Sequence, residues 1–98
     1  MGAYKTDYET VAAGQTDQVC GPTGAAGDEL VRVIVTVSTS GAGGTCSIKD
    51  GAGSAIPLVA ASAPLGVYSV DIGARSTSGA WKITTGAAAT AIAVGSFK

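Results

Sequence analysis

The feature that most limits the fold is a run of mainly β-branched side chains, Leu30-Val31-Arg32-Val33-Ile34-Val35-Thr36-Val37. Branching at Cβ favours extended backbone, so this run predicts a β-strand. A period of two places alternate side chains on opposite faces, and we expect one face to be core: Val31, Val33, Val35 and Val37. The other face is of mixed polarity, which is typical of a strand that a neighbour partly covers: Leu30, Arg32, Ile34 and Thr36.

Further runs of this kind follow at short intervals, each bounded by glycine, serine or proline. They predict strands at residues 17–20, 45–49, 55–60, 67–72, 80–84 and 90–97. The predicted fold class is all-β: a single small antiparallel β-sandwich or jelly-roll-like barrel of roughly seven to eight strands, spanning residues 1–98. The linking stretches are predicted to be loops at residues 38–44, 50–54 and 74–79, with a hairpin loop at 86–89.

The same alternation predicts which side chains of these strands point inward: Cys46, Ile48, Ile56, Leu58, Tyr68, Val70, Ile72, Trp81, Ile83, Ile92 and Val94. We interpret Trp81 and Tyr68 as core residues rather than as a sugar-stacking platform, because a chain with 5% aromatic residues needs their bulk inside. The opposite faces carry polar side chains, as a sheet with one wet side requires: Lys49, Ser69, Asp71, Lys82 and Thr84.

The N-terminal residues 1–12 have two interpretations. Tyr4, Thr6 and Tyr8 alternate with charged side chains as in a strand. An ordinary edge strand is the plainer interpretation. The alternative is an extended arm that adds a strand to a neighbouring subunit.

Composition indicates a domain that gains stability by association. Charged residues make up only 13% of the chain, about half the usual share, and 18 of its residues are alanine. Alanine buries little area, so the core is thin, and small domains of this kind usually need disulfides, metal or oligomerisation. We expect a homo-oligomer, with a trimer favoured.

Several classes of function have little support. The chain has no histidine, so neither a Ser-His-acid triad nor a Cys-His pair can form, and we predict that the protein is not an enzyme. Asp28, Glu29 and Asp50 are oxygen donors that could meet Ca²⁺, but no spaced ligand loop accompanies them, so we expect no metal and no cofactor. Six basic residues spread along the chain make no nucleic-acid patch.

The compartment follows from three further features. The N-terminus has acidic residues where a secretion signal needs a basic end and an apolar stretch, so we expect no signal peptide. The longest apolar run, residues 87–94, is far shorter than a bilayer span, so we expect no membrane partner. Cys20 and Cys46 are interpreted as reduced, buried residues, and the alternative is a single disulfide bond between them.

Four segments carry a resemblance to a known group: residues 15–30 (Gln15-Thr16-Asp17-Gln18-Val19-Cys20-Gly21-Pro22 and onward to Leu30), Ser47-Ile48-Lys49-Asp50-Gly51, Gly79-Ala80-Trp81-Lys82-Ile83-Thr84-Thr85-Gly86 and Val94-Gly95-Ser96-Phe97. Together they resemble small virion structural proteins of tailed bacteriophages, of the capsid decoration (cement) or head-fibre type. The resemblance covers nearly the whole chain and brings no catalytic residues.

The resemblance implies a decoration protein on the capsid surface of the virion, made in the host cytoplasm, that stabilises the head by binding the major capsid protein. The candidate contact residues are Tyr4, Tyr8, Leu30, Arg32 and Ile34. The alternative is a head-fibre or tail accessory module that binds a host receptor or carbohydrate through loops such as residues 38–44 and 74–79.

Overall fold

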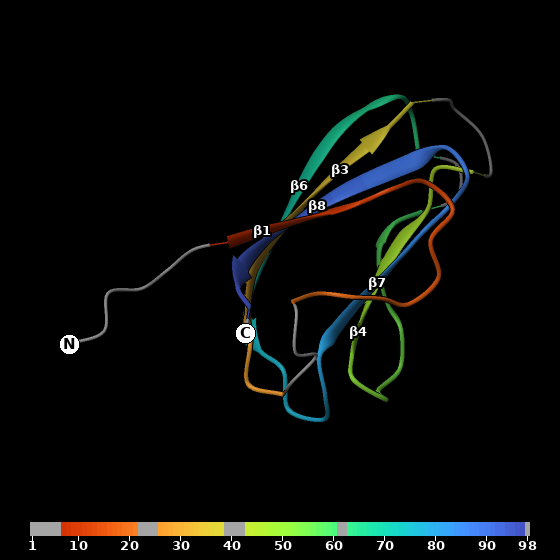
Figure 1. The fold of residues 1–98 in the computed structure, drawn as a ribbon. Helices are drawn as coiled ribbons and strands as arrows, with labels where there is room; N and C mark the ends of the chain where they lie inside the picture. The colour runs from red at the N-terminus through yellow and green to blue at the C-terminus, as the bar shows by residue number, and fades with distance from the viewer. Residues whose placement is uncertain (1–6, 22–25, 39–42, 61–62, 98) are drawn as a thin grey trace.

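The computed structural model describes residues 7–21, 26–38, 43–60 and 63–97, and these form eight β-strands without a helix (Figure 1). Every predicted strand is present, with bounds that differ by a few residues. The strands are β1 (Asp7–Val11), β2 (Gln18–Val19), β3 (Glu29–Val37), β4 (Cys46–Asp50), β5 (Ile56–Val59), β6 (Gly66–Arg75), β7 (Trp81–Thr85) and β8 (Ala89–Ser96). Within these residues there is no helix long and apolar enough to span a bilayer.

The strand pairing is nested from the ends of the chain inward. β1 pairs with β8, β2 with β7, β3 with β6 and β4 with β5, all antiparallel. Two further antiparallel pairings, β3 with β8 and β4 with β7, join these pairs into sheets of order β1-β8-β3-β6 and β2-β7-β4-β5. The all-β prediction is confirmed: the structure is a small β-sandwich of two antiparallel sheets, and its strand order is that of a jelly roll.

The core lies between the two sheets. Fully or almost fully buried apolar side chains form one cluster: Val11, Cys20, Leu30, Val33, Val35, Val37, Cys46, Ile48, Val59, Trp81, Ile83, Ala89, Ala91 and Ala93. The indole Nε1 of Trp81 donates a hydrogen bond to the backbone carbonyl of Asp28 at 3.0 Å, which satisfies the one polar atom of that side chain. The predicted core positions Cys46, Ile48, Trp81 and Ile83 are confirmed.

A β-bulge in β3 corrects the predicted faces of this strand. The registers with β6 and with β8 both shift between Leu30 and Arg32, and Val31 has no opposite residue in either. The extra residue reverses the alternation on one side of it. Leu30, expected on the outer face, is therefore fully buried, whereas Val31, expected in the core, is only half-buried. From Arg32 onward the predicted faces are observed.

In β8 the side chains predicted to face the core face outward, and the side chains predicted to face outward lie in the core. Its small side chains Ala89, Ala91 and Ala93 are buried, whereas Ile92 is 38% exposed and Val94 is half-buried on the outside. β8 lies between β1 and β3, and its alanines share the core cluster with large side chains such as Trp81. Alternating large with small residues across facing layers is how a close-packed interior fills.

The predicted core positions near the β5 and β6 edges are less buried than expected. Ile56 is 46% exposed, which contradicts its assignment to the core, and Leu58 is half-buried. On β6 the inward side chains Tyr68, Val70 and Ile72 are also half-buried. The cause is position, because β5 and β6 are edge strands of their sheets and have neighbours on one side only.

Two of the expected connections differ from the prediction. Residues 86–88 are not a hairpin loop, because β7 and β8 belong to different sheets and the connection crosses between them. Ala74 and Arg75 are part of β6 rather than of a loop. The connection from β4 to β5 is the hairpin that the Asp50-Gly51 sequence indicated, lengthened by residues 52–55.

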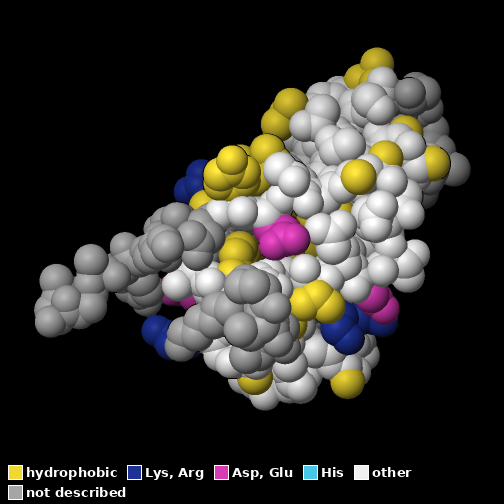
Figure 2. All heavy atoms as spheres, viewed as in Figure 1, with side chains coloured by type: hydrophobic (Ala, Val, Ile, Leu, Met, Phe, Trp, Pro, Cys, Tyr) yellow, Lys and Arg dark blue, Asp and Glu magenta, His cyan; other side chains and the backbone are white. Residues whose placement is uncertain are grey.

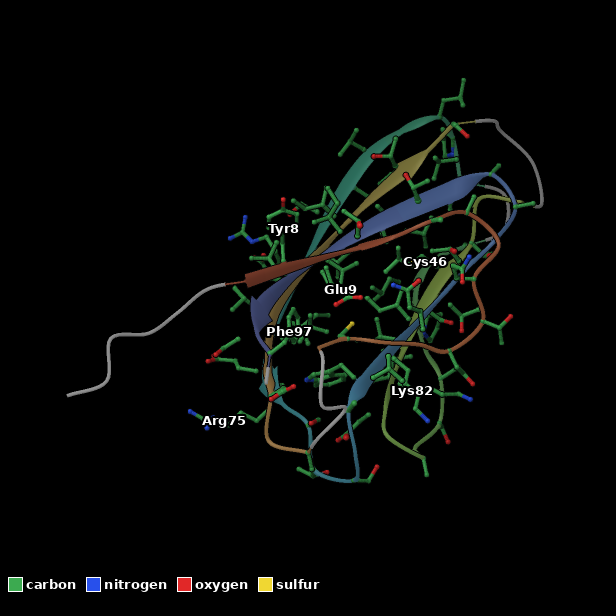
Figure 3. The ribbon with its side chains drawn as sticks, viewed as in Figure 1. Tyr8, Glu9, Cys46, Arg75, Lys82 and Phe97 are labelled. Carbon is green, nitrogen blue, oxygen red and sulfur yellow. The ribbon has the colours of Figure 1, made fainter. Side chains whose placement is uncertain are left out.

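β1 is an ordinary edge strand that pairs with β8 of its own chain, from Asp7 opposite Gly95 to Val11 opposite Ala91. Residues 1–6 of the alternative arm lie outside the described residues. Glu9 points into the space between the sheets (Figure 3). Its carboxylate accepts hydrogen bonds from the backbone N–H of Gly21 at 3.1 Å and from Nε2 of Gln18 at 3.2 Å, and so ties β1 to the segment that contains β2.

Candidate interaction surface

The outer side of the β1-β8-β3-β6 sheet brings together side chains from four strands. We call this surface the outer face of the first sheet. The registers arrange its side chains in three rows across the strands: Tyr8, Val94, Arg32 and Asp71; Thr10, Ile92, Ile34 and Ser69; and Thr90, Thr36 and Val67. Mainly uncharged residues, some apolar and some with hydroxyl groups, therefore line this sheet surface.

An apolar band runs through this face. Tyr8 is 72% exposed, Val67 is 67% exposed and Ile92 is 38% exposed, while Ile34 and Val94 are half-buried. Tyr8 points away from the second sheet in Figure 3, and hydrophobic side chains gather over this part of the molecule in Figure 2. These exposed apolar side chains share one sheet face, which makes that face the candidate interaction surface.

The band contains one ion pair. Nε of Arg32 lies 3.8 Å from Oδ1 of Asp71, and the two side chains are 48% and 83% exposed. An exposed pair at this distance contributes little to stability, on the order of 0–1 kcal/mol. The pair does affect the charge of the surface, because the two charges cancel. A partner that covers this face therefore buries both charges of the pair together and no unpaired charge.

The outer side of the second sheet is polar by comparison. Lys49 lies opposite Lys82 in the β4–β7 register, and Nζ of Lys49 is 3.3 Å from the Asp17 carboxylate. The hydrogen bond from Lys49 holds the pKa of Asp17 below its ordinary value, with a further contribution from the Thr84 hydroxyl. Val19, 41% exposed, is the exposed large apolar side chain of β2. The two outer faces of the sandwich therefore differ in chemistry.

The predicted contact residues have three outcomes. Tyr8, Arg32 and Ile34 lie together on the outer face of the first sheet, in two adjacent rows. Leu30 does not belong to the surface, because the bulge after it turns its side chain into the core and leaves it 0% exposed. Tyr4 lies outside the described residues.

The sequence interpretation missed three residues of this surface: Val67, Ile92 and Val94. Ile92 and Val94 were assigned to the core because the larger member of an alternating pair usually faces inward. The sequence signal for the observed facing is the series of small residues at 89, 91, 93 and 95. Such a series is required only on a face that packs closely against the interior of the protein. Val67 lies at the free edge of the sheet and has no such signal.

The carboxylates weighed as Ca²⁺ donors do not form a site. Both carboxylate oxygens of Asp50 accept hydrogen bonds from the 77–78 backbone at 2.9–3.0 Å, and the Thr77 hydroxyl donates another at 2.9 Å. These bonds, that of Ser78 first, hold the pKa of Asp50 below its ordinary value and fix the β6–β7 loop to the end of β4. Across residues 7–21, 26–38, 43–60 and 63–97 no three potential ligand side chains gather as a metal would require.

The two cysteines are structural. Cys20 and Cys46 are both buried as free thiols, at 0% and 2% exposure. Burial, with smaller contributions from the carboxylates of Glu9 and Asp28, raises the pKa of the Cys20 thiol to about 12. Burial alone raises the pKa of Cys46 to about 11. Neither forms the thiolate that a reactive cysteine needs at neutral pH.

No family model matches the chain, and no curated protein or solved structure is significantly similar to it.

Proposed function

We propose that this protein is a bacteriophage capsid decoration protein and that it binds the major capsid protein through the outer face of the first sheet. The observation that carries the proposal is the contrast between the two outer faces of the sandwich. One carries exposed or half-buried apolar side chains from all four of its strands among serine and threonine, with one ion pair, and the other carries the partly exposed charges of Lys49, Lys82 and Asp17. The eight-stranded jelly roll is also an architecture that viral capsid proteins use.

The size of the face suits a stable protein contact. Four strands about 4.8 Å apart make a surface about 19 Å wide, and the nine-residue strand β3 is about 30 Å long. Because β1 has only five residues and β8 eight, the flat footprint is roughly 500 Å², before the relief of the side chains is counted. A standard protein interface buries about 800 Å² of accessible surface on each partner, so this face provides most or all of one.

The chemistry of the face suits a large and permanent partner better than a soluble small ligand. Tyr8, Ile92 and Val67 offer exposed apolar area on the surface of a sheet. A shell of identical capsid subunits presents the same complementary surface many times, so each copy of a small, weakly charged module gains buried area there that its thin core does not provide.

The test is co-sedimentation of the purified chain with undecorated capsids of its own phage. The wild-type chain should saturate a fixed number of sites per capsid. Ile92→Asp places an uncompensated charge in the centre of the face and should weaken capsid binding about tenfold or more. Val19→Asp is the matched control, because Val19 has nearly the same exposure, 41% against 38%, on the opposite side of the sandwich.

Two results would overturn the proposal. Equal weakening by both substitutions would mean that the outer face of the first sheet is not the contact. A folded wild-type chain that ignores capsids but binds host cells or glycans would replace decoration with the receptor-binding or carbohydrate-binding module of a head fibre or tail.

A further inference from the structure

The sequence contains one aspartate–glycine pair, Asp50–Gly51, and no asparagine. A peptide backbone rearranges most readily at such a pair, because glycine has no Cβ to hinder its own nitrogen from approaching the preceding side chain. In this reaction the nitrogen of Gly51 bonds to Cγ of Asp50, and the hydroxyl group of the protonated carboxyl leaves as water with the hydrogen of that nitrogen. Water then opens the resulting succinimide ring at either carbonyl, which gives aspartate or isoaspartate.

The fold requires both members of this pair. Gly51 has a φ of +55°, and a Cβ on it would overlap the Ser78 hydroxyl and the backbone nitrogen of Gly79, so any other residue is strained there. Asp50 is required because its carboxylate accepts the hydrogen bonds that attach the β6–β7 loop to the end of β4. The reactive pair therefore follows from the architecture, and its protection comes from the structure around it.

The attacking atom is blocked in the folded protein. The backbone nitrogen of Gly51 becomes a nucleophile only after base has removed its hydrogen. This N–H donates a hydrogen bond to the carbonyl oxygen of Ala80 at 2.9 Å, and Gly51 is buried. A buried and hydrogen-bonded N–H meets base only when the structure around it opens, as in amide hydrogen exchange.

The carboxyl group under attack is held in an unreactive state. Its two oxygens accept hydrogen bonds from the backbone N–H of Thr77 at 2.9 and 3.0 Å and from that of Ser78 at 3.0 Å. Ring closure expels one of these oxygens and therefore has to break its hydrogen bonds. The same bonds, that of Ser78 first, hold the pKa of Asp50 below its ordinary value, so the carboxyl stays an anion, from which water cannot leave.

The hydroxyl groups of the same loop hold the main chain on both sides of Gly51. The Ser78 hydroxyl donates to the carbonyl oxygen of Asp50 at 2.6 Å and accepts from the N–H of Ala52 at 3.1 Å. The Thr77 hydroxyl donates to the Asp50 carboxylate at 2.9 Å. We call residues 77–80 the covering segment. It restrains the nitrogen, the carboxyl group and the peptide between them at the same time.

We propose that Asp50–Gly51 is a site of spontaneous isoaspartate formation and that the covering segment keeps it unreactive in the folded protein. Isoaspartate forms there only when the covering segment opens. The change is then lasting, because isoaspartate makes the main chain one carbon longer and its side-chain carboxyl one carbon shorter, which removes the match to the N–H groups of residues 77–78. The reaction does not depend on capsid binding and is tested without capsids.

The first experiment compares wild-type protein incubated in the folded state and in guanidinium chloride at the same temperature. Both incubations are at about pH 5, where some unfolded aspartate is protonated because its ordinary pKa is about 4. Enzymatic methylation of isoaspartyl carboxyl groups counts the product, and peptide fragmentation in a mass spectrometer locates it. Isoaspartate at residue 50 should form at least about tenfold more slowly in the folded protein. Equal rates, or isoaspartate first at another aspartate of the folded protein, overturn the proposal.

The second experiment loosens the covering segment by one small substitution. Ser78→Ala removes two hydroxyl hydrogen bonds, and Thr84→Val is the matched control, because it removes the two that the Thr84 hydroxyl makes with Asp17. Trp81 fluorescence checks that each variant is folded. Folded Ser78→Ala should form isoaspartate at residue 50 about fivefold faster than the wild type or more, and at the wild-type rate when unfolded. An unchanged rate in the folded variant, or equal acceleration by Thr84→Val, contradicts the proposed protection.

Discussion

Replacing Leu30 by alanine should destabilise the protein far more than the same change at Val31. Leu30 is 0% exposed, and leucine-to-alanine changes at such sites cost about 2.7–5 kcal/mol, because the lost transfer free energy adds to that of the cavity. Val31→Ala removes two methyl groups that are only half-buried, which costs about 1 kcal/mol. A chain of 98 residues has a free energy of unfolding of about 5–15 kcal/mol, so the first change removes a large part of it.

Equilibrium unfolding in urea measures both changes, with the fluorescence of the single, buried Trp81 as the signal. All variants need the same protein concentration, because association stabilises the folded state. We expect the midpoint of Leu30→Ala to fall by roughly 2 M and that of Val31→Ala by less than about 1 M, with similar slopes. Equal costs, or a larger cost at Val31, would refute the bulge and restore simple alternation along β3.

Three further predictions test separate parts of the fold. A Cβ at Gly95 would overlap the carbonyl oxygen of Glu29, so Gly95→Ala should destabilise by more than about 1 kcal/mol in the same urea assay, and a neutral result would mean that the two strands lie farther apart. Iodoacetamide should modify Cys20 and Cys46 in native protein no faster than the protein unfolds, and rapid labelling at pH 8 would contradict their raised pKa values. The pKa of Asp50 is lower in the folded state, so its carboxylate stabilises the fold above its unfolded pKa of about 4 and loses this effect as pH falls through the folded pKa. Asp50→Asn should therefore lower the Tm at pH 7. The Tm of this variant should also decrease less than that of the wild type between pH 7 and pH 2.

Much of the fold follows from local rules. β-branched runs and turn residues placed the strands, and alternation placed Cys46, Ile48, Trp81 and Ile83 in the core. The jelly-roll order itself depends on which distant strands meet, as Asp7 meets Gly95, and no local pattern encodes that pairing. The 86–88 connection was predicted wrongly for the same reason: its local sequence resembles a hairpin turn, but it leads from one sheet to the other.

The errors in the candidate surface have two physical causes. One extra residue in a strand reverses every side chain on one side of it, so the bulge at Val31 moved Leu30 from the predicted surface into the core. In β8, hydrophobicity suggested Ile92 and Val94 for the interior, but packing density allowed only alanine there. Tyr8, Arg32 and Ile34 lie on the outer face of the first sheet because β1 keeps a regular register and β3 alternates regularly from Arg32 onward.

The nested pairing of the strands also determines when the protein can fold during synthesis. Among the eight described strands β1 is synthesised first, and β8 is the only one of them that pairs with it; β2 waits for β7 in the same way. Until β8 emerges, Val11 and Glu9 of β1 have no strand to pair with, although the β4–β5 hairpin and then the β3–β6 and β4–β7 pairs can already form. Pairing strands so distant in sequence is slow, on the order of milliseconds to seconds. Loss of the last ten residues should therefore unfold the whole domain rather than trim one edge of it.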